Sequence, residues 1–171
     1  MHMNKRPQQG FFLLEALIAI LIFSLGILGM VAMGGAAIAA QSDAQYRSDA
    51  ANLANEISST IALNVDRFNA GSSYGSNALS LAGTLTPFQH RATGQNCAFS
   101  GAPSAKAEVT GWVGKVSTIG PGLPGLPGAT STSQQILVAT GAGFNRLTVT
   151  ICWQAPNDKA VRQHTLVSYI N

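Results

Sequence analysis

Charged side chains are scarce in this sequence. They make up 10% of the 171 residues, against about a quarter in ordinary soluble domains. One cause is an apolar run from Phe11 to Ala40, in which Glu15 is the only charged residue; the remainder is rich in Gly, Ala, Ser and Thr. The net charge of +3 falls to +1, with 8 basic and 7 acidic side chains, once Lys5 and Arg6 are set aside. No basic stripe then remains for nucleic acid, so nucleic acid is a poor candidate partner.

Catalytic motifs are absent as well. The sequence has no P-loop, no G-x-S-x-G, no H-E-x-x-H and no C-x-x-C pair. Its seven carboxylates are spread singly, and His90 and His164 lie at no zinc-ligand spacing. We interpret both histidines as surface or strand residues. The sequence therefore predicts a protein that is not an enzyme, with no cofactor and no metal.

Cysteine occurs only twice, at Cys97 and Cys152, 55 residues apart. In an oxidising compartment an isolated pair of this kind predicts one disulfide. A closed loop of that length stabilises the fold by about 4 kcal/mol in the chain-entropy model. Two unpaired buried thiols are the alternative.

The apolar run is long enough to cross a membrane. About 20 apolar residues span the bilayer core, and residues 11–40 exceed that. Ala37-Ile38-Ala39 has the small-x-small form of a signal-peptidase site, but a signal peptide has an apolar region of only about 7–15 residues. Neither that reading nor an uncleaved signal anchor explains Glu15, because a charge inside the membrane costs about 2.5–3.5 kcal/mol. The basic start predicts that the rest of the chain lies outside the inner membrane.

The beginning of the chain resembles the type IV pilin family. The resemblance rests on a basic leader with Lys5 and Arg6, then Gly10, Phe11, Glu15 and a long charge-free run. It implies that a prepilin peptidase cuts between Gly10 and Phe11 and methylates the new amine of Phe11. It also implies that Glu15 pairs with the Phe11 amine of a neighbouring subunit during assembly with other minor and major pilins.

The family fold is α+β, with a long N-terminal α-helix packed on a small antiparallel β-sheet head. It divides the chain into a leader (residues 1–10), a transmembrane half of the helix (11–40), an amphipathic half (41–68) and a head (69–171). The amphipathic half is also visible in the residues, because an apolar stripe recurs at three- and four-residue steps. Its members are Ala50, Leu53, Ala54, Ile57, Ile61 and Val65. Many major pilins have a proline in the membrane half, which this chain lacks.

Different segments of the head predict different local structures. Residues 69–95 are rich in Gly, Ser and Asn and predict a long surface connection. Residues 105–116 fit a short helix or a strand, and resemblance to the PilV group of minor pilins favours a helix bearing Trp112. That group continues with a Leu-Pro-Gly turn, here 123–125 or 126–128, and a run similar to 148–153, although its doubled glycine is not kept here. Glycine at every third position of 122–128 extends over only two repeats, so it predicts a turn-rich loop and not collagen.

Three strands are predicted near the end of the chain, at 136–139, 147–153 and 163–170. Their alternation and short connections predict an antiparallel meander, covered by the amphipathic helix half.

The resemblance predicts a minor pilin of the pilus priming or tip complex, with a role in adhesion or twitching motility. Such a protein is held in the bacterial inner membrane with its head in the periplasm, then carried to the pilus on the cell surface. Two alternatives stay open: a minor pseudopilin of a type II secretion system, and a pilin that binds DNA or another ligand. DNA binding would require six dispersed basic residues to gather on one surface: Arg91, Lys106, Lys115, Arg146, Lys159 and Arg162.

Overall fold

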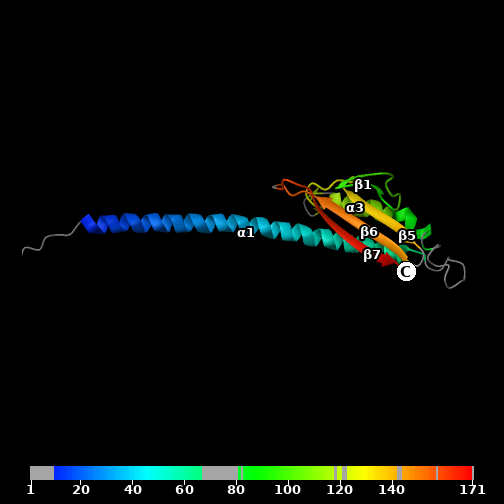
Figure 1. The fold of residues 1–171 in the computed structure, drawn as a ribbon, viewed down its shortest axis with the longest axis horizontal. Helices are drawn as coiled ribbons and strands as arrows, with labels where there is room; N and C mark the ends of the chain where they lie inside the picture. The colour runs from blue at the N-terminus through cyan, green and yellow to red at the C-terminus, as the bar shows by residue number, and fades with distance from the viewer. Residues whose placement is uncertain are drawn as a thin grey trace, which may run out of the picture. The chain divides into compact units, whose positions relative to one another are not determined.

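The fold is α+β, with one long N-terminal apolar helix and small antiparallel sheets (Figure 1). The computed structural model describes residues 10–66, 81, 83–117, 119–120, 123–141, 144–156 and 158–170. Contacts divide the chain into two compact units, Met1–Ala44 and Gln45–Asn171. Helix α1, Gly10–Asn64, contributes residues to both. The predicted α+β class is therefore confirmed.

The first unit consists of the apolar part of α1. Every described side chain from Phe12 to Gln41 is exposed, including Phe12 at 76% and Met33 at 76%. One helix, α1, is long and apolar enough to cross a membrane among the described residues, with a mean hydropathy of 2.7 over its most apolar stretch. Its polar Ser24 is compatible with lipid because the hydroxyl donates to the carbonyl of Ile20 at 2.7 Å.

The predicted apolar stripe lies against the core of the second unit. Ala50, Ala54, Ile57 and Ile61 are at most 1% exposed. The helix ends at Asn64, however, and the prediction that it extends to about residue 68 is wrong; residue 68 itself lies outside the described residues. Val65, just after the helix, is buried and still donates to the carbonyl of Ile61 at 3.1 Å, so the apolar pattern continues past the last helical residue.

The predicted meander is confirmed and its strands are longer than predicted. Strands β5 (Gln134–Gly141), β6 (Phe144–Trp153) and β7 (Arg162–Ile170) form one antiparallel sheet in the order β5-β6-β7. Alternate residues of β6 point into the core: Leu147, Val149, Ile151 and Trp153. They share one hydrophobic cluster with the stripe of α1, as predicted.

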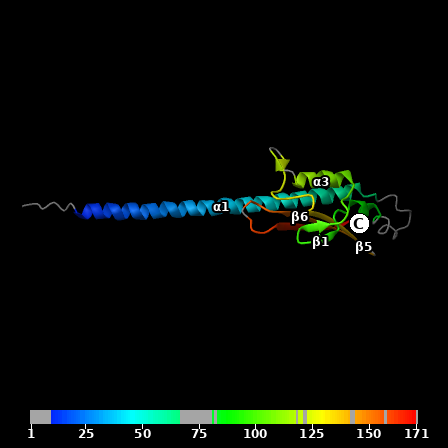
Figure 2. The ribbon, with the colours of Figure 1, turned by 90° about the horizontal axis from the view of Figure 1, so that it is seen from above.

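Residues 107–117 form a helix, which settles the ambiguity between helix and strand. This helix, α3 (Ala107–Ser117), lies beside α1 (Figure 2) and buries one face. The buried residues are Val109, Trp112, Val113 and Val116. The indole nitrogen of Trp112 donates to the carbonyl of Leu53 at 2.9 Å, and Lys115 forms a salt bridge with Glu56. These two contacts fix α3 against α1.

The prediction of a surface connection is wrong for its last part. Leu81, Leu85 and Phe88 are buried at 4%, 1% and 1% exposure, and Phe88 ends the short 3₁₀ helix η1 (Thr86–Phe88). These three residues stand at i, i+4 and i+7, which is a helical spacing, but Gly83 and Pro87 lie between them and mask the pattern. Residues 69–80 lie outside the described residues.

Two small hairpins complete the second unit. Strands β1 (Thr93–Gln95) and β2 (Ala98–Ser100) form one, and β3 (Ile119–Gly120) and β4 (Leu123–Pro124) form the other. The glycine-proline stretch then makes a turn, as predicted. Gly128 has a φ of +65°, and a Cβ there would lie 2.8 Å from the carbonyl oxygen of Gln154, so glycine is required.

Candidate functional site

Glu15 is the one ionisable group in the exposed apolar part of α1. Leu14, Ile18, Ala19 and Ile22 surround it on the same side of the helix. The described residues of the first unit, 10–44, contain no Lys, Arg or His, so none of their side chains can form an ion pair with Glu15. The carboxylate therefore lies among aliphatic side chains, and the described residues of its unit supply no partner of opposite charge.

The predicted cleavage point lies at the beginning of α1. Gly10 is the first helical residue, and the rest of the predicted leader, residues 1–9, lies outside the described residues. Phe11 and Glu15 are four residues apart, which is about 6 Å along a helix axis. An amine created at Phe11 would thus lie about one turn from the carboxylate of its own chain.

The predicted disulfide is confirmed. Cys97 and Cys152 are bonded, with their Cα atoms 5.8 Å apart. Cys97 belongs to the two-residue turn between β1 and β2, where Asn96 and Cys97 have φ values of 52° and 65°. Two positive φ values are typical of the type I′ hairpin turn. The bond fastens this hairpin to β6, the central strand of the sheet.

Gln134 supports the same region and was not anticipated from the sequence. Its side-chain amide accepts from the backbone N–H of Cys152 at 3.3 Å and donates to the carbonyl of Cys152 at 3.1 Å. The side chain is completely buried. A glutamine beside a short apolar run carries no signal of this role, because its partner is 18 residues away in sequence.

His90 was predicted to be a surface or a strand residue, and its 4% exposure rules out the surface position. Its backbone forms an isolated β-bridge with Ile136. Its Nδ1 accepts from the N–H of Ser104 at 3.2 Å, and Nε2 lies 3.4 Å from the carbonyl oxygen of Ser131. Burial lowers the pKa of His90, the Ser131 carbonyl opposes this, and neighbouring Arg91 lowers it further. The neutral ring with the proton on Nε2 satisfies both contacts.

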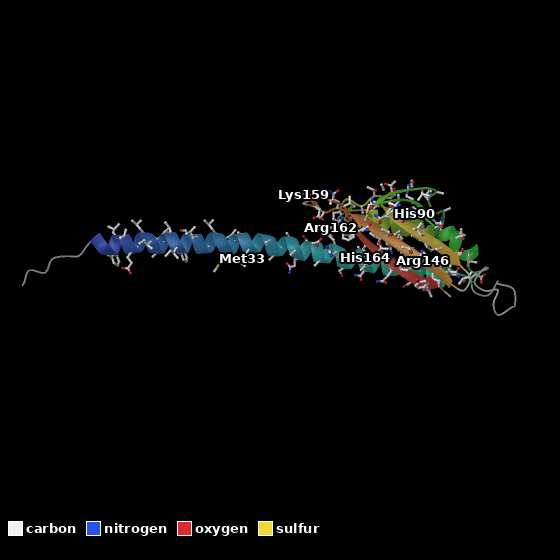
Figure 3. The ribbon with its side chains drawn as sticks, in the orientation of Figure 1. Met33, His90, Arg146, Lys159, Arg162 and His164 are labelled. Atoms are coloured by element: carbon white, nitrogen blue, oxygen red, sulfur yellow. A yellow bond between two sulfur atoms is a disulfide. The ribbon has the colours of Figure 1, made fainter. Side chains whose placement is uncertain are left out.

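The six basic residues that DNA binding would require do not form one patch. Four have partners: Lys115 pairs with Glu56, Arg162 binds both carboxylate oxygens of Asp158, Lys106 lies over the Phe88 ring and Arg91 donates to the Ser131 carbonyl. Arg146 and Arg162 lie at opposite ends of the β6–β7 ladder (Figure 3). Arg146 lies opposite Tyr169, which is seven positions along β7 from Arg162, or roughly 24 Å.

The described part of the chain brings no metal-binding group together. No three His, Cys, Asp or Glu side chains within it are placed to hold a metal ion. The sequence-predicted site residues thus fall into two separate places: Gly10, Phe11 and Glu15 at the start of α1, and the disulfide in the second unit.

Comparison of the chain with protein-family models, with curated proteins and with solved structures finds no match. The resemblance to pilins therefore rests on the residues around Gly10 and on the layout of the elements.

Proposed function

We propose that this protein is a minor type IV pilin, a structural subunit of the pilus priming or tip complex. A prepilin peptidase removes residues 1–10, and the mature chain resides in the inner membrane until it assembles with other pilins. The head lies outside that membrane, where the Cys97–Cys152 bond forms. Through pilus assembly the protein contributes to adhesion or twitching motility.

One observation carries the proposal: Glu15 is a lone carboxylate in an exposed apolar helix. A helix that only anchors a domain has no use for a charge, and removing that charge would favour insertion. The carboxylate is supported instead as an assembly group. In a bundle of such helices lipid and water are excluded, and the available cation is the amine of Phe11, on the same chain or on a neighbouring one. The resemblance to pilins favours the neighbour's amine.

Such a pair selects one axial arrangement of the helices. A carboxylate left unpaired in a low-dielectric bundle is strongly disfavoured, so registers that leave Glu15 without an amine are disfavoured too. The aliphatic side chains around Glu15 can contact a neighbouring helix in several axial registers of similar free energy. The charge pair would supply the specificity that they lack.

The experiment replaces Glu15 and measures association with partner pilins by crosslinking at equal membrane abundance. Glu15→Leu should insert and be cleaved normally, because it makes the segment more apolar, yet its crosslinking should fall by about tenfold or more. Glu15→Asp keeps the charge and should retain part of the association.

Ser24→Leu is the matched control. It also replaces a polar residue of the same apolar segment by leucine, but it leaves the carboxylate in place. It should crosslink like the wild type. Equal crosslinking by Glu15→Leu and the wild type would refute the docking role of the carboxylate.

A further inference from the structure

The three-stranded sheet β5-β6-β7 has two edges, and the described part of the chain covers only one of them. At the β5 edge, the backbone of His90 exchanges two hydrogen bonds with Ile136, each with an N···O distance of 3.0 Å. At the other edge, β6 is the only strand paired with β7 among the described residues. An antiparallel edge strand directs the N–H and C=O groups of every second residue away from its neighbour. No backbone or side-chain hydrogen bond from the described residues reaches those groups between Gln163 and Ser168.

Strand β7 also lacks the features that normally prevent an edge from pairing. Natural sheets protect their edges with lysine, proline, bulges or very short strands. Strand β7 has nine residues, its register against β6 is continuous, and its only charged residue is Arg162 at its start. It contains no proline. The edge is thus chemically open to a further strand.

The side chains beside this edge are apolar and exposed. Val167 and Tyr169 are 49% and 60% exposed and point to the sheet face opposite α1. On the same face, Arg146 of β6 lies directly opposite Tyr169. Arg146 is exposed, and no carboxylate among the described residues pairs with it. Aromatic and arginine side chains of this kind contribute much of the energy of protein interfaces.

We propose that the edge of β7 between Gln163 and Ser168 binds an extended segment of another polypeptide as a fourth strand of the sheet. Backbone hydrogen bonds would hold such a segment, and alternate apolar side chains would contact Val167 and Tyr169. A carboxylate on the segment would pair with Arg146, because the two residues would lie two strand spacings apart, roughly 9.6 Å, within reach of two long side chains. The proposal does not depend on the pilin function.

Charge favours a different polypeptide over a second copy of this chain. A second copy would present its own β7 edge, which has no acidic residue between Arg162 and Ile170. It would add a second Arg146 to the same region, and its residues Arg162–Ile170 would supply no anion to either arginine. A proline-free segment with alternating apolar residues and one acidic residue could do three things at once. It could form hydrogen bonds with the β7 backbone, contact Val167 and Tyr169, and pair with Arg146.

The test uses the full chain in detergent micelles and amide hydrogen exchange resolved by residue. The probe is a synthetic ten-residue peptide of alternating Val and Thr with one Glu and no proline. In the free protein, the outward amides of Gln163–Ser168 should exchange fast. Excess peptide should slow them by about tenfold or more, and leave the amides of α3 unchanged.

Charge swaps and a matched pair of variants sharpen the result. A peptide with Lys in place of Glu should bind more weakly, and Arg146→Glu should reverse that preference. Val167→Lys should abolish the slowing, whereas Ser59→Lys, the same charge change on the exposed side of α1, should not.

Two results would overturn the proposal. One is unchanged exchange in β7 with every peptide. The other is slow exchange of the outward amides before any peptide is added, because the edge would then be covered already; a doubled protein mass would identify a second copy as the cover, and a monomer mass would identify the chain itself.

Discussion

At the scale of single residues, Cys97 has an unusual position. The Asn96–Cys97 turn requires φ > 0 at both residues, and glycine is the residue best suited to the second of them. Here a cysteine with a φ of 65° takes that place, and its bond to Cys152 connects the hairpin to β6. The disulfide explains why a cysteine stands at residue 97, where the backbone conformation favours glycine.

Loss of this bond should destabilise the second unit. Cys152→Ser removes about 4 kcal/mol in the chain-entropy model. The thermal midpoint of the full chain in detergent, followed by near-UV circular dichroism, should fall by about 10 °C. Reductant should lower the midpoint of the wild type and leave the variant unchanged.

Comparison of two substitutions at residue 97 separates the bond from the turn. Both Cys97→Ser and Cys97→Gly lose the disulfide, but glycine adopts φ > 0 without strain. Cys97→Gly should therefore be the more stable of the two by about 1 kcal/mol. A less stable glycine variant would contradict the turn assigned to Asn96 and Cys97.

His90 should make stability depend on pH. Burial lowers its pKa in the folded state from the ordinary value of 6.5, so below about pH 6.5 the unfolded chain binds more protons than the folded one. The free energy of unfolding should therefore decrease as the pH falls from 7 to 5. Asp158, whose pKa is lowered chiefly by its hydrogen bonds to Arg162, titrates below this window.

His90→Gln is the matched variant for the pH experiment. A glutamine can accept from the Ser104 N–H and donate to the Ser131 carbonyl, but it does not titrate. Its thermal midpoint should change less between pH 7 and pH 5 than that of the wild type. Parallel pH profiles of the two proteins would contradict the role of His90.

At the scale of elements, the second unit is held by the face that α1 shares with α3 and the sheet. Ile57 is 1% exposed in that core, whereas Leu63 on the same helix is 83% exposed. Ile57→Ala should lower the free energy of unfolding by about 2–5 kcal/mol, because it leaves a cavity. Leu63→Ala should change it by less than about 0.5 kcal/mol. Thermal unfolding of the two variants measures the difference.

The elements that the sequence predicts well are those with a regular period. The stripe from Ala50 to Ile61 and the alternation of β6 both reflect one buried face, and the structure confirms them. The end of α1 and the burial of Phe88 were missed. Val65 stands one residue past Asn64 and still donates to the carbonyl of Ile61, so the stripe continues beyond the helix. Phe88 follows Leu81 and Leu85 at helical spacing, but Gly83 and Pro87 between them mask that pattern.

The disulfide could be predicted because only two cysteines exist, whereas the contacts of Gln134 and His90 could not. Their partners, Cys152, Ser104 and Ser131, are 14 to 41 residues away and are mostly backbone groups, which every residue carries. The group at the start of α1 was recognised from the spacing of Gly10, Phe11 and Glu15 alone. Its role stays a prediction, because it concerns other chains.

At the scale of the whole molecule, the two units are suited to different surroundings. Of the large apolar side chains that are exposed among the described residues, 16 lie in the first unit and only four in the second, namely Leu63, Val161, Val167 and Tyr169. A surface as apolar as the first is stable in lipid or against similar helices. The second unit has its own core and a disulfide. This division fits a subunit that moves from a membrane into a filament while its head stays in water.

The intact mass of the protein extracted from membranes tests the central claim most directly. The proposal predicts a mature chain that begins at Phe11 and carries one additional methyl group on its amine. Gly10→Val should leave the precursor uncut, because the β-branched side chain crowds the cleavage point. A mature wild-type chain that begins at Ala40, or one that still begins at Met1, would contradict the account.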